Sequence, residues 1–186
     1  MKNITYITIA IILMGTSCKK DDPAPETPVN EEELITTLIL TYVDQVTSDT
    51  KQMVFRDLDG DGGNAPVIAA DTLDAGAMYD LTVELLNESV SPTDTITYEV
   101  EDEGAEHQFF FEVATANLSI AYADMDTNGD PIGLVNTSSA AGASSGSLTV
   151  TLRHEPDKGA AGVSDGDITN AGGETDIEVD FDVVIQ

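Results

Sequence analysis

The sequence predicts an all-β fold: an antiparallel β-sandwich of immunoglobulin-like type with seven to eight strands. Apolar and polar residues alternate at period two in several short segments after residue 37, which is typical of strands with one buried face. Turn signals rich in glycine, asparagine and aspartate separate these segments, and no long amphipathic helical pattern lies between them. Short antiparallel strands in this number favour a sandwich. A jelly roll or a small barrel is the alternative.

The strand pattern occurs in seven segments, and residues 96–106 fit either an eighth strand or a short helix. In chain order the seven segments are residues 38–42, 53–55, 79–85, 109–113, 118–122, 148–152 and 177–185. In the last strand the residues expected on the outer face are acidic, namely Asp176, Glu178, Asp180 and Asp182. Turns are expected at residues 59–63, 128–129, 141–146 and 170–173.

The N-terminus predicts secretion. Lys2 precedes an apolar segment, residues 4–14, which is shorter than the roughly 20 residues that span a bilayer. Small residues at 15–17 then precede Cys18, the one cysteine of the chain, and this arrangement is similar to a bacterial lipoprotein signal. The resemblance implies that residues 1–17 are a signal peptide and that Cys18 carries the lipid anchor. An ordinary secretory leader with an incidental cysteine is the alternative.

A stalk is expected after the lipidated cysteine. Residues 18–30 include three prolines, which favour polyproline II and prevent regular hydrogen-bonded structure. At about 3.1 Å per residue, residues 21–30 would hold the following domain roughly 30 Å from the lipid. Residues 19–22, Lys-Lys-Asp-Asp, resemble the signal that sends Bacteroidota lipoproteins to the cell surface. We therefore expect an outer-membrane, surface-exposed location, with a periplasm-facing anchor as the alternative, and one β-sandwich domain over residues 31–186.

The charge of the chain is strongly negative. Its 35 acidic residues face 7 lysines and arginines, for a formal net charge of −28. Such a protein repels nucleic-acid phosphates, so nucleic-acid binding is excluded, whereas divalent cations and basic partners are attracted. Solubility in a salty medium is a simpler cause of the same charge. A single cysteine leaves no intrachain disulfide to stabilise the fold.

Two aspartate-rich turns follow the pattern D-x-D-x-[DN]-G, which places alternate oxygen ligands around a glycine as Ca²⁺ requires. Neither is an EF-hand, because the position of the bidentate glutamate holds Ile68 in one loop and Val135 in the other. Hairpin-turn chemistry alone is the alternative explanation. The candidate calcium ligands are Asp57, Asp59 and Asp61 in the first turn, and Asp124, Asp126, Asn128 and Asp130 in the second.

The two histidines form a second candidate site. His107 lies at the start of one predicted strand, an even number of residues from its inward-facing residues, so its side chain is expected to face inward. His154 has the same relation to the inward-facing residues at the end of another strand. If these strands are antiparallel neighbours, the two imidazoles lie together at one end of the sandwich, with Glu106 and Glu155 beside them. Two imidazoles with one or two carboxylates suit Zn²⁺ or another transition metal. Two structural histidines with ordinary hydrogen bonds are the alternative.

The sequence has one match to a catalytic motif, and its context does not suit an active site. Residues 142–146 match G-x-S-x-G, but this stretch is rich in serine, glycine and alanine and leads into a strand, whereas a nucleophile elbow joins a strand to a helix. No phosphate-binding loop, H-E-x-x-H motif or dinucleotide fingerprint occurs. The sequence therefore predicts a protein that is not an enzyme.

Four segments of the domain, together with the signal, resemble a family of small Bacteroidota-type envelope lipoproteins. The segments are FRDLDGDGGNAPV (55–67), EHQFFF (106–111), LRHEPDK (152–158) and AGGETDIEV (171–179). The resemblance implies a lipid anchor in the cell envelope and no particular activity. We predict a lipid-anchored, surface-exposed, non-catalytic binding module that captures a ligand or metal beside an outer-membrane receptor. The alternative is a structural or adhesive domain stiffened by calcium.

Overall fold

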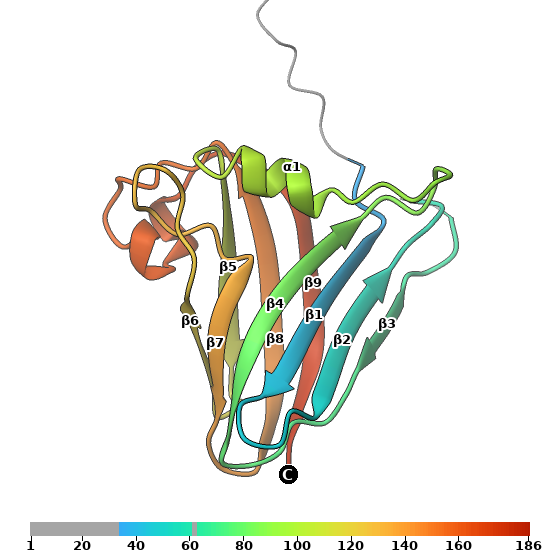
Figure 1. Ribbon diagram of the computed structural model, residues 1–186, viewed down its shortest axis with the longest axis vertical. Coiled ribbons are helices and arrows are strands. Elements are labelled where there is room, and N and C mark those ends of the chain that lie inside the picture. Colours follow the sequence, from blue (N-terminus) through green and yellow to red (C-terminus); the bar gives the residue numbers. More distant parts are fainter. Residues whose placement is uncertain (1–33, 61–62) are drawn as a thin grey trace, which may run out of the picture. The chain divides into compact units, whose positions relative to one another are not determined.

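Two antiparallel sheets form a β-sandwich in the part of the chain that the computed structural model describes, residues 34–60 and 63–186 (Figure 1). The predicted signal peptide, Cys18, the stalk and Asp61 lie outside the described residues. Within those residues, no helix is both long and apolar enough to cross a membrane. The fold class is therefore all-β and antiparallel, as the alternation of apolar and polar residues predicts.

The larger sheet has six strands in the order β3-β2-β1-β4-β7-β6. Each neighbouring pair is antiparallel, and β1 lies between β2 and β4. The strands are β1 (Thr37–Asp44), β2 (Thr50–Arg56), β3 (Val67–Ala70), β4 (Ala77–Leu86), β6 (Leu118–Tyr122) and β7 (Val135–Ala140).

The smaller sheet has three strands in the order β5-β8-β9. They are β5 (His107–Ala114), β8 (Ser144–His154) and β9 (Glu174–Ile185). Without β2 and β3, the order β1-β4-β7-β6 against β5-β8-β9 corresponds to the ABED and CFG sheets of a seven-stranded immunoglobulin sandwich. The β2-β3 hairpin then extends one edge. Membership of the immunoglobulin fold itself stays a prediction.

The described residues contain nine strands, more than the seven to eight expected from the sequence. The two strands without a predicted counterpart are β3 and β7. All four residues of β3 are exposed, so this edge strand has no alternating pattern. In β7 the inward side chains include Asn136 and Ser138, which are 1% and 2% exposed. Hydrophobic periodicity misses a strand whose buried face is polar.

The tertiary structure decides one open alternative and corrects one local prediction. Of the strand and the short helix expected for residues 96–106, the structure has the helix, α1 (Thr97–Asp102), and Ile96 and Val100, four residues apart, both face the core. The expected loop at 141–146 is shorter, since β8 already begins at Ser144. Gly146 permits this extension of β8, because a Cβ there would lie 2.1 Å from the carbonyl oxygen of Ala114.

The main core lies between the two sheets. It is built from the inward residues of both, including Leu40, Leu81 and Phe181, all fully buried. The rings of Tyr42 and Tyr79 contact each other edge to face, with centroids 5.7 Å apart. The alternating residues identified in the sequence thus form the interface between the layers.

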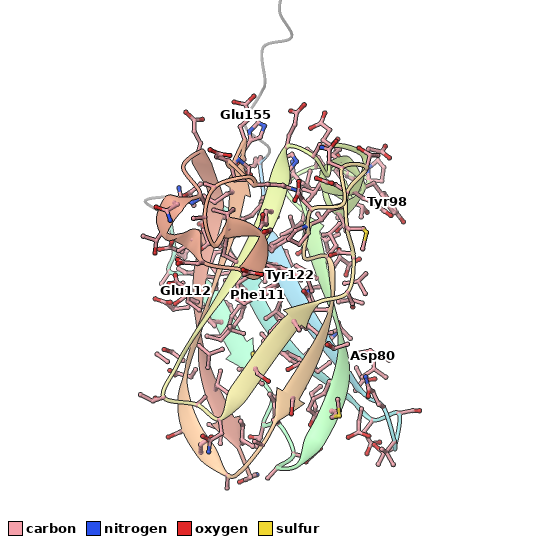
Figure 2. The ribbon with its side chains drawn as sticks, turned by 90° about the vertical axis from the view of Figure 1, so that its left-hand side faces the viewer. Asp80, Tyr98, Phe111, Glu112, Tyr122 and Glu155 are labelled. Atoms are coloured by element: carbon pink, nitrogen blue, oxygen red, sulfur yellow. The ribbon has the colours of Figure 1, made fainter. Side chains whose placement is uncertain are left out.

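A smaller apolar cluster lies on the outer side of β5. Phe110 packs there against Val163 and Ala171, which belong to the β8–β9 connection. This connection contains two short 3₁₀ helices, η1 (Val163–Asp165) and η2 (Ile168–Asn170). We call the end of the sandwich where α1, the start of β5, the end of β8 and the start of β9 lie the α1 pole (Figure 1). Figure 2 labels Tyr98 and Glu155 at this end.

Candidate metal centre

The two histidines lie together at the α1 pole. His107, the first residue of β5, is the cross-strand partner of His154, the last residue of β8. Their rings stack, with centroids 4.7 Å apart and planes 11° apart. Both residues are buried, 2% and 6% exposed. The juxtaposition expected from strand parity is present because side chains that share a face on adjacent antiparallel strands are neighbours.

A β-bulge brings a third side chain to this pair. The register between β8 and β9 shifts at Arg153, and Asp176 of β9 is left as the extra residue. Only 4% of the Asp176 side chain is exposed, and its Oδ2 lies 3.9 Å from Nε2 of His107. The expectation that Asp176 faces outward is therefore wrong. A strict period of two assumes an unbroken ladder, and the bulge breaks it.

Glycine allows β9 to approach β8 closely at this point. Gly173 has a φ of +69°, and a Cβ on it would lie 2.2 Å from the carbonyl oxygen of His154. Only glycine fits both the conformation and the space. The pair Gly172-Gly173 is the one sequence signal near the bulge, and it indicates an irregular strand start without specifying which side chain turns inward.

The surroundings of His107 hold its imidazole in a form suited to metal binding. Its Nδ1 lies 3.2 Å from the carbonyl oxygen of Glu103. A carbonyl oxygen only accepts, so Nδ1 carries the proton in this contact and Nε2 of the neutral ring has a free lone pair. Burial lowers the pKa of His107, and the neighbouring His154 lowers it further, so the ring is neutral at pH 7. Metal-binding histidines are commonly oriented by such a backbone contact.

One nitrogen of each histidine and one carboxylate oxygen of Asp176 lie within 4.8 Å of one another. Two ligand atoms bound to one ion through bonds of about 2.0–2.2 Å are roughly 3–4 Å apart, a range that already includes the 3.9 Å between Oδ2 of Asp176 and Nε2 of His107. The stacked rings still require a rotation. An imidazole binds metal through a lone pair in its ring plane, and two nearly parallel planes do not meet at one ion. One ring must therefore turn about its Cα–Cβ bond.

A second, more exposed group shares His154. The carboxylates of Glu106 and Glu155 lie with a nitrogen of His154 within 4.8 Å of one another. Oε2 of Glu106 is 3.8 Å from Nε2 of His154, and the backbone N–H of Glu155 donates to the carbonyl oxygen of Glu106 at 2.6 Å. Both glutamates are exposed. His154 thus lies between a buried ligand group and one at the surface.

In the first aspartate-rich turn, the carboxylates of Asp57 and Asp59 accept hydrogen bonds from nearby residues. Oδ1 of Asp57 accepts from the backbone N–H of Gly60 at 3.0 Å. Oδ2 of Asp59 accepts from the backbone N–H of Asn64 at 3.1 Å and from its side-chain amide at 2.7 Å. The hydrogen bond from the Asn64 backbone is the main cause of the lowered pKa of Asp59. These contacts are typical of a turn, and calcium binding by Asp57, Asp59 and Asp61 stays a prediction.

In the second turn, Asp124 and Asp126 also have hydrogen-bond partners. Both carboxylate oxygens of Asp124 accept from backbone N–H groups, those of Gly133 and Val135, at 2.8 Å each. Asp126 accepts from the Lys158 ammonium at 3.0 Å. Burial raises the pKa of Asp126, but the hydrogen bonds from Lys158 and from backbone N–H groups outweigh it and lower the pKa overall. Calcium here would have to displace a lysine, and it too stays a prediction.

Comparisons with known proteins give no assignment: no protein family, curated protein or solved structure matches the chain. The resemblance to Bacteroidota-type envelope lipoproteins stays a prediction. The chemistry of the residues at the α1 pole is accordingly the basis for a functional proposal.

Proposed function

We propose that the protein is a lipid-anchored, surface-exposed binding module that captures a divalent transition-metal ion at the α1 pole. The convergence of His107, His154 and Asp176 supports this proposal more than any other observation. We further propose that the module works beside an outer-membrane receptor. In this role the protein carries the ion and catalyses no reaction.

The ligand set favours zinc over calcium. Two imidazoles and one carboxylate are the nitrogen and oxygen ligands that Zn²⁺ accepts, with a fourth position left for water or a partner's ligand. Calcium prefers six to eight oxygen ligands, which this buried group lacks. Because His107 is neutral at pH 7, binding there does not first require the loss of a proton from that ring.

The two ligand groups define a route for the ion. Exposed Glu106 and Glu155 attract a cation from solvent, and His154 belongs to both groups. Rotation of the His154 ring would carry the ion from the surface to His107 and Asp176. The negative charge of the whole protein raises the local concentration of cations at this entrance.

We expect the purified domain to bind one Zn²⁺ per chain, measured by titration calorimetry and by metal analysis after dialysis. His154→Ala and Asp176→Asn each remove a ligand. Loss of an outer-shell partner of a metal ligand typically costs roughly 10- to 100-fold in affinity. We expect losses larger than that for both variants.

Asp182→Asn is the matched control, because it removes the same charge from the exposed outer face of the same strand. It should bind Zn²⁺ as tightly as the wild type in 150 mM salt. Equal affinity of the wild type and Asp176→Asn would mean that surface carboxylates bind the ion non-specifically, and the proposal would be wrong.

The lipid anchor is tested independently of the metal. Because the thiol of Cys18 is the proposed attachment point, Cys18→Ser should move the protein from the membrane fraction to the soluble fraction, or leave it as an uncleaved precursor. Fractionation of cells followed by mass spectrometry of the N-terminus measures both outcomes. A Cys18→Ser protein that matures normally and stays with the outer membrane would contradict lipidation.

A further inference from the structure

A cavity of about 620 Å³ lies beside α1, between the turn that follows this helix and the segment that links β6 to β7. Its floor is apolar. Val83, Ile132 and Leu134 line it, and each is at most 6% exposed. Among the side chains of the candidate metal centre, Glu106 alone also lines the cavity. The cavity is therefore a neighbouring site with a different chemistry.

The rim of the cavity is acidic where α1 ends. Glu101, Asp102 and Glu103 line this side and are exposed. In the described part of the chain, no lysine or arginine forms an ion pair with any of them. The rim therefore carries negative charge that no ion pair among the described residues neutralises.

Residues 124–127 form another part of the lining, and one of its two aspartates is paired with a cation. Lys158 neutralises Asp126, whereas Asp124 has no lysine or arginine partner among the described residues and accepts backbone hydrogen bonds with both oxygens. Met125, between them in sequence, is 68% exposed and also lines the cavity. A flexible thioether adapts to apolar ligands of different shape. Met125 thus adds an adaptable apolar surface to the lining of the cavity.

We propose that the cavity binds a small organic cation with an apolar body. The ammonium group lies at the α1 rim, near Glu101 and Glu103, and the apolar body packs on Val83, Ile132 and Leu134. Its volume is within the range of small-molecule sites, about 300–1,000 Å³. A bare metal ion would leave the apolar floor unused, and a neutral molecule would leave the rim unpaired. An anion would be repelled by a chain of net charge −28.

Three probes of one shape test the proposal: 3-phenylpropylammonium, 3-phenylpropanol and 3-phenylpropionate. Each is titrated into the isotopically labelled domain while the methyl NMR signals of Met125, Ile132 and Leu134 are followed. We expect saturable shifts with the ammonium probe, binding at least about fivefold weaker with the alcohol, and none with the carboxylate. Equal affinity for the ammonium and the alcohol, or no saturable shift with the ammonium, would overturn the proposal.

Variants that remove charge distinguish binding by the nearby glutamates from long-range attraction by the net charge of the protein. Glu101→Gln combined with Glu103→Gln should weaken the ammonium probe at least about threefold and leave the alcohol unchanged. The control, Glu84→Gln with Glu112→Gln, removes the same net charge from exposed positions on the outer sides of β4 and β5. Equal weakening by both pairs would mean that only long-range attraction operates, and would overturn the proposed site. Glu106 is left unchanged because it also faces His154.

A space-filling variant adds a readout that does not depend on charge. Ala105 is exposed and lines the cavity, so Ala105→Trp should occupy part of its volume. Binding of the ammonium probe should fall at least about tenfold while Zn²⁺ binding at the histidines is retained. Unchanged probe affinity in Ala105→Trp would place the probe elsewhere and contradict the proposal.

Discussion

Replacing Lys158 with methionine is expected to lower the free energy of unfolding by about 3–5 kcal/mol. The Lys158 side chain is 6% exposed, and its ammonium group makes three contacts: with Asp126 at 3.0 Å, and with the carbonyl oxygens of Gly104 at 2.6 Å and Pro131 at 2.9 Å. It thereby joins the α1–β5 turn, the β6–β7 segment and the β8–β9 connection. Methionine keeps most of the volume but leaves the carboxylate of Asp126, which is 1% exposed, without its cation.

Urea denaturation at pH 7 measures this effect, and Lys51→Met is the matched control. Lys51 is 3.5 Å from Asp74, and the two side chains are 28% and 55% exposed, so its loss should cost no more than about 1 kcal/mol. If Lys158→Met also lowers the free energy of unfolding by no more than about 1 kcal/mol, the buried contacts of Lys158 contribute little to stability. Removing both charges, with Lys158→Met and Asp126→Leu together, should cost less than Lys158→Met alone, because no buried charge is left unpaired.

The contribution of the Lys158–Asp126 ion pair to the stability of the fold depends on pH. The pKa of Asp126 is lowered in the folded protein, so its contribution is complete above the unfolded pKa of about 3.9 and is lost as the pH falls through the folded value. The difference in stability between the wild type and Lys158→Met should therefore be largest near pH 7. It should become smaller as the pH falls, because a proton on Asp126 removes the unpaired buried charge from the variant and weakens the ion pair of the wild type.

Phe110→Ala is expected to destabilise the domain by about 3–5 kcal/mol. By strand parity Phe110 lies on the outer side of β5, yet its side chain is fully buried beneath Val163 and Ala171 of the β8–β9 connection. Removing the ring opens a cavity there and weakens the attachment of this connection. We expect faster amide hydrogen exchange at residues 163–171, measured alongside urea denaturation.

Val184→Ala is the control for Phe110→Ala. Val184 also lies on the outer side of its strand, but it is 43% exposed and the substitution should change stability by no more than about 0.5 kcal/mol. Similar small effects of both variants would mean that the β8–β9 connection contributes little to the fold. A large effect of Phe110→Ala alone would show that this connection forms part of the folded core.

The sequence by itself predicts the all-β class and most of the strands, because a half-buried strand places apolar residues at every second position. It also places His107 and His154 on one face at the ends of two strands, which the β5–β8 register brings into contact. The prediction fails where a buried face is not apolar. Strand β7 buries Asn136 and Ser138, and no hydrophobic pattern indicates it.

Tertiary structure alone decided the rest of the site. Asp176 turns inward at a bulge that depends on how β8 and β9 pair, and pairing is a non-local property that periodicity in one segment does not contain. Phe110 is buried for the same kind of reason, since a distant connection covers the outer side of β5. Local alternation determines which side of a strand a residue takes. What covers that side, and where the register slips, depends on contacts between residues far apart in the chain.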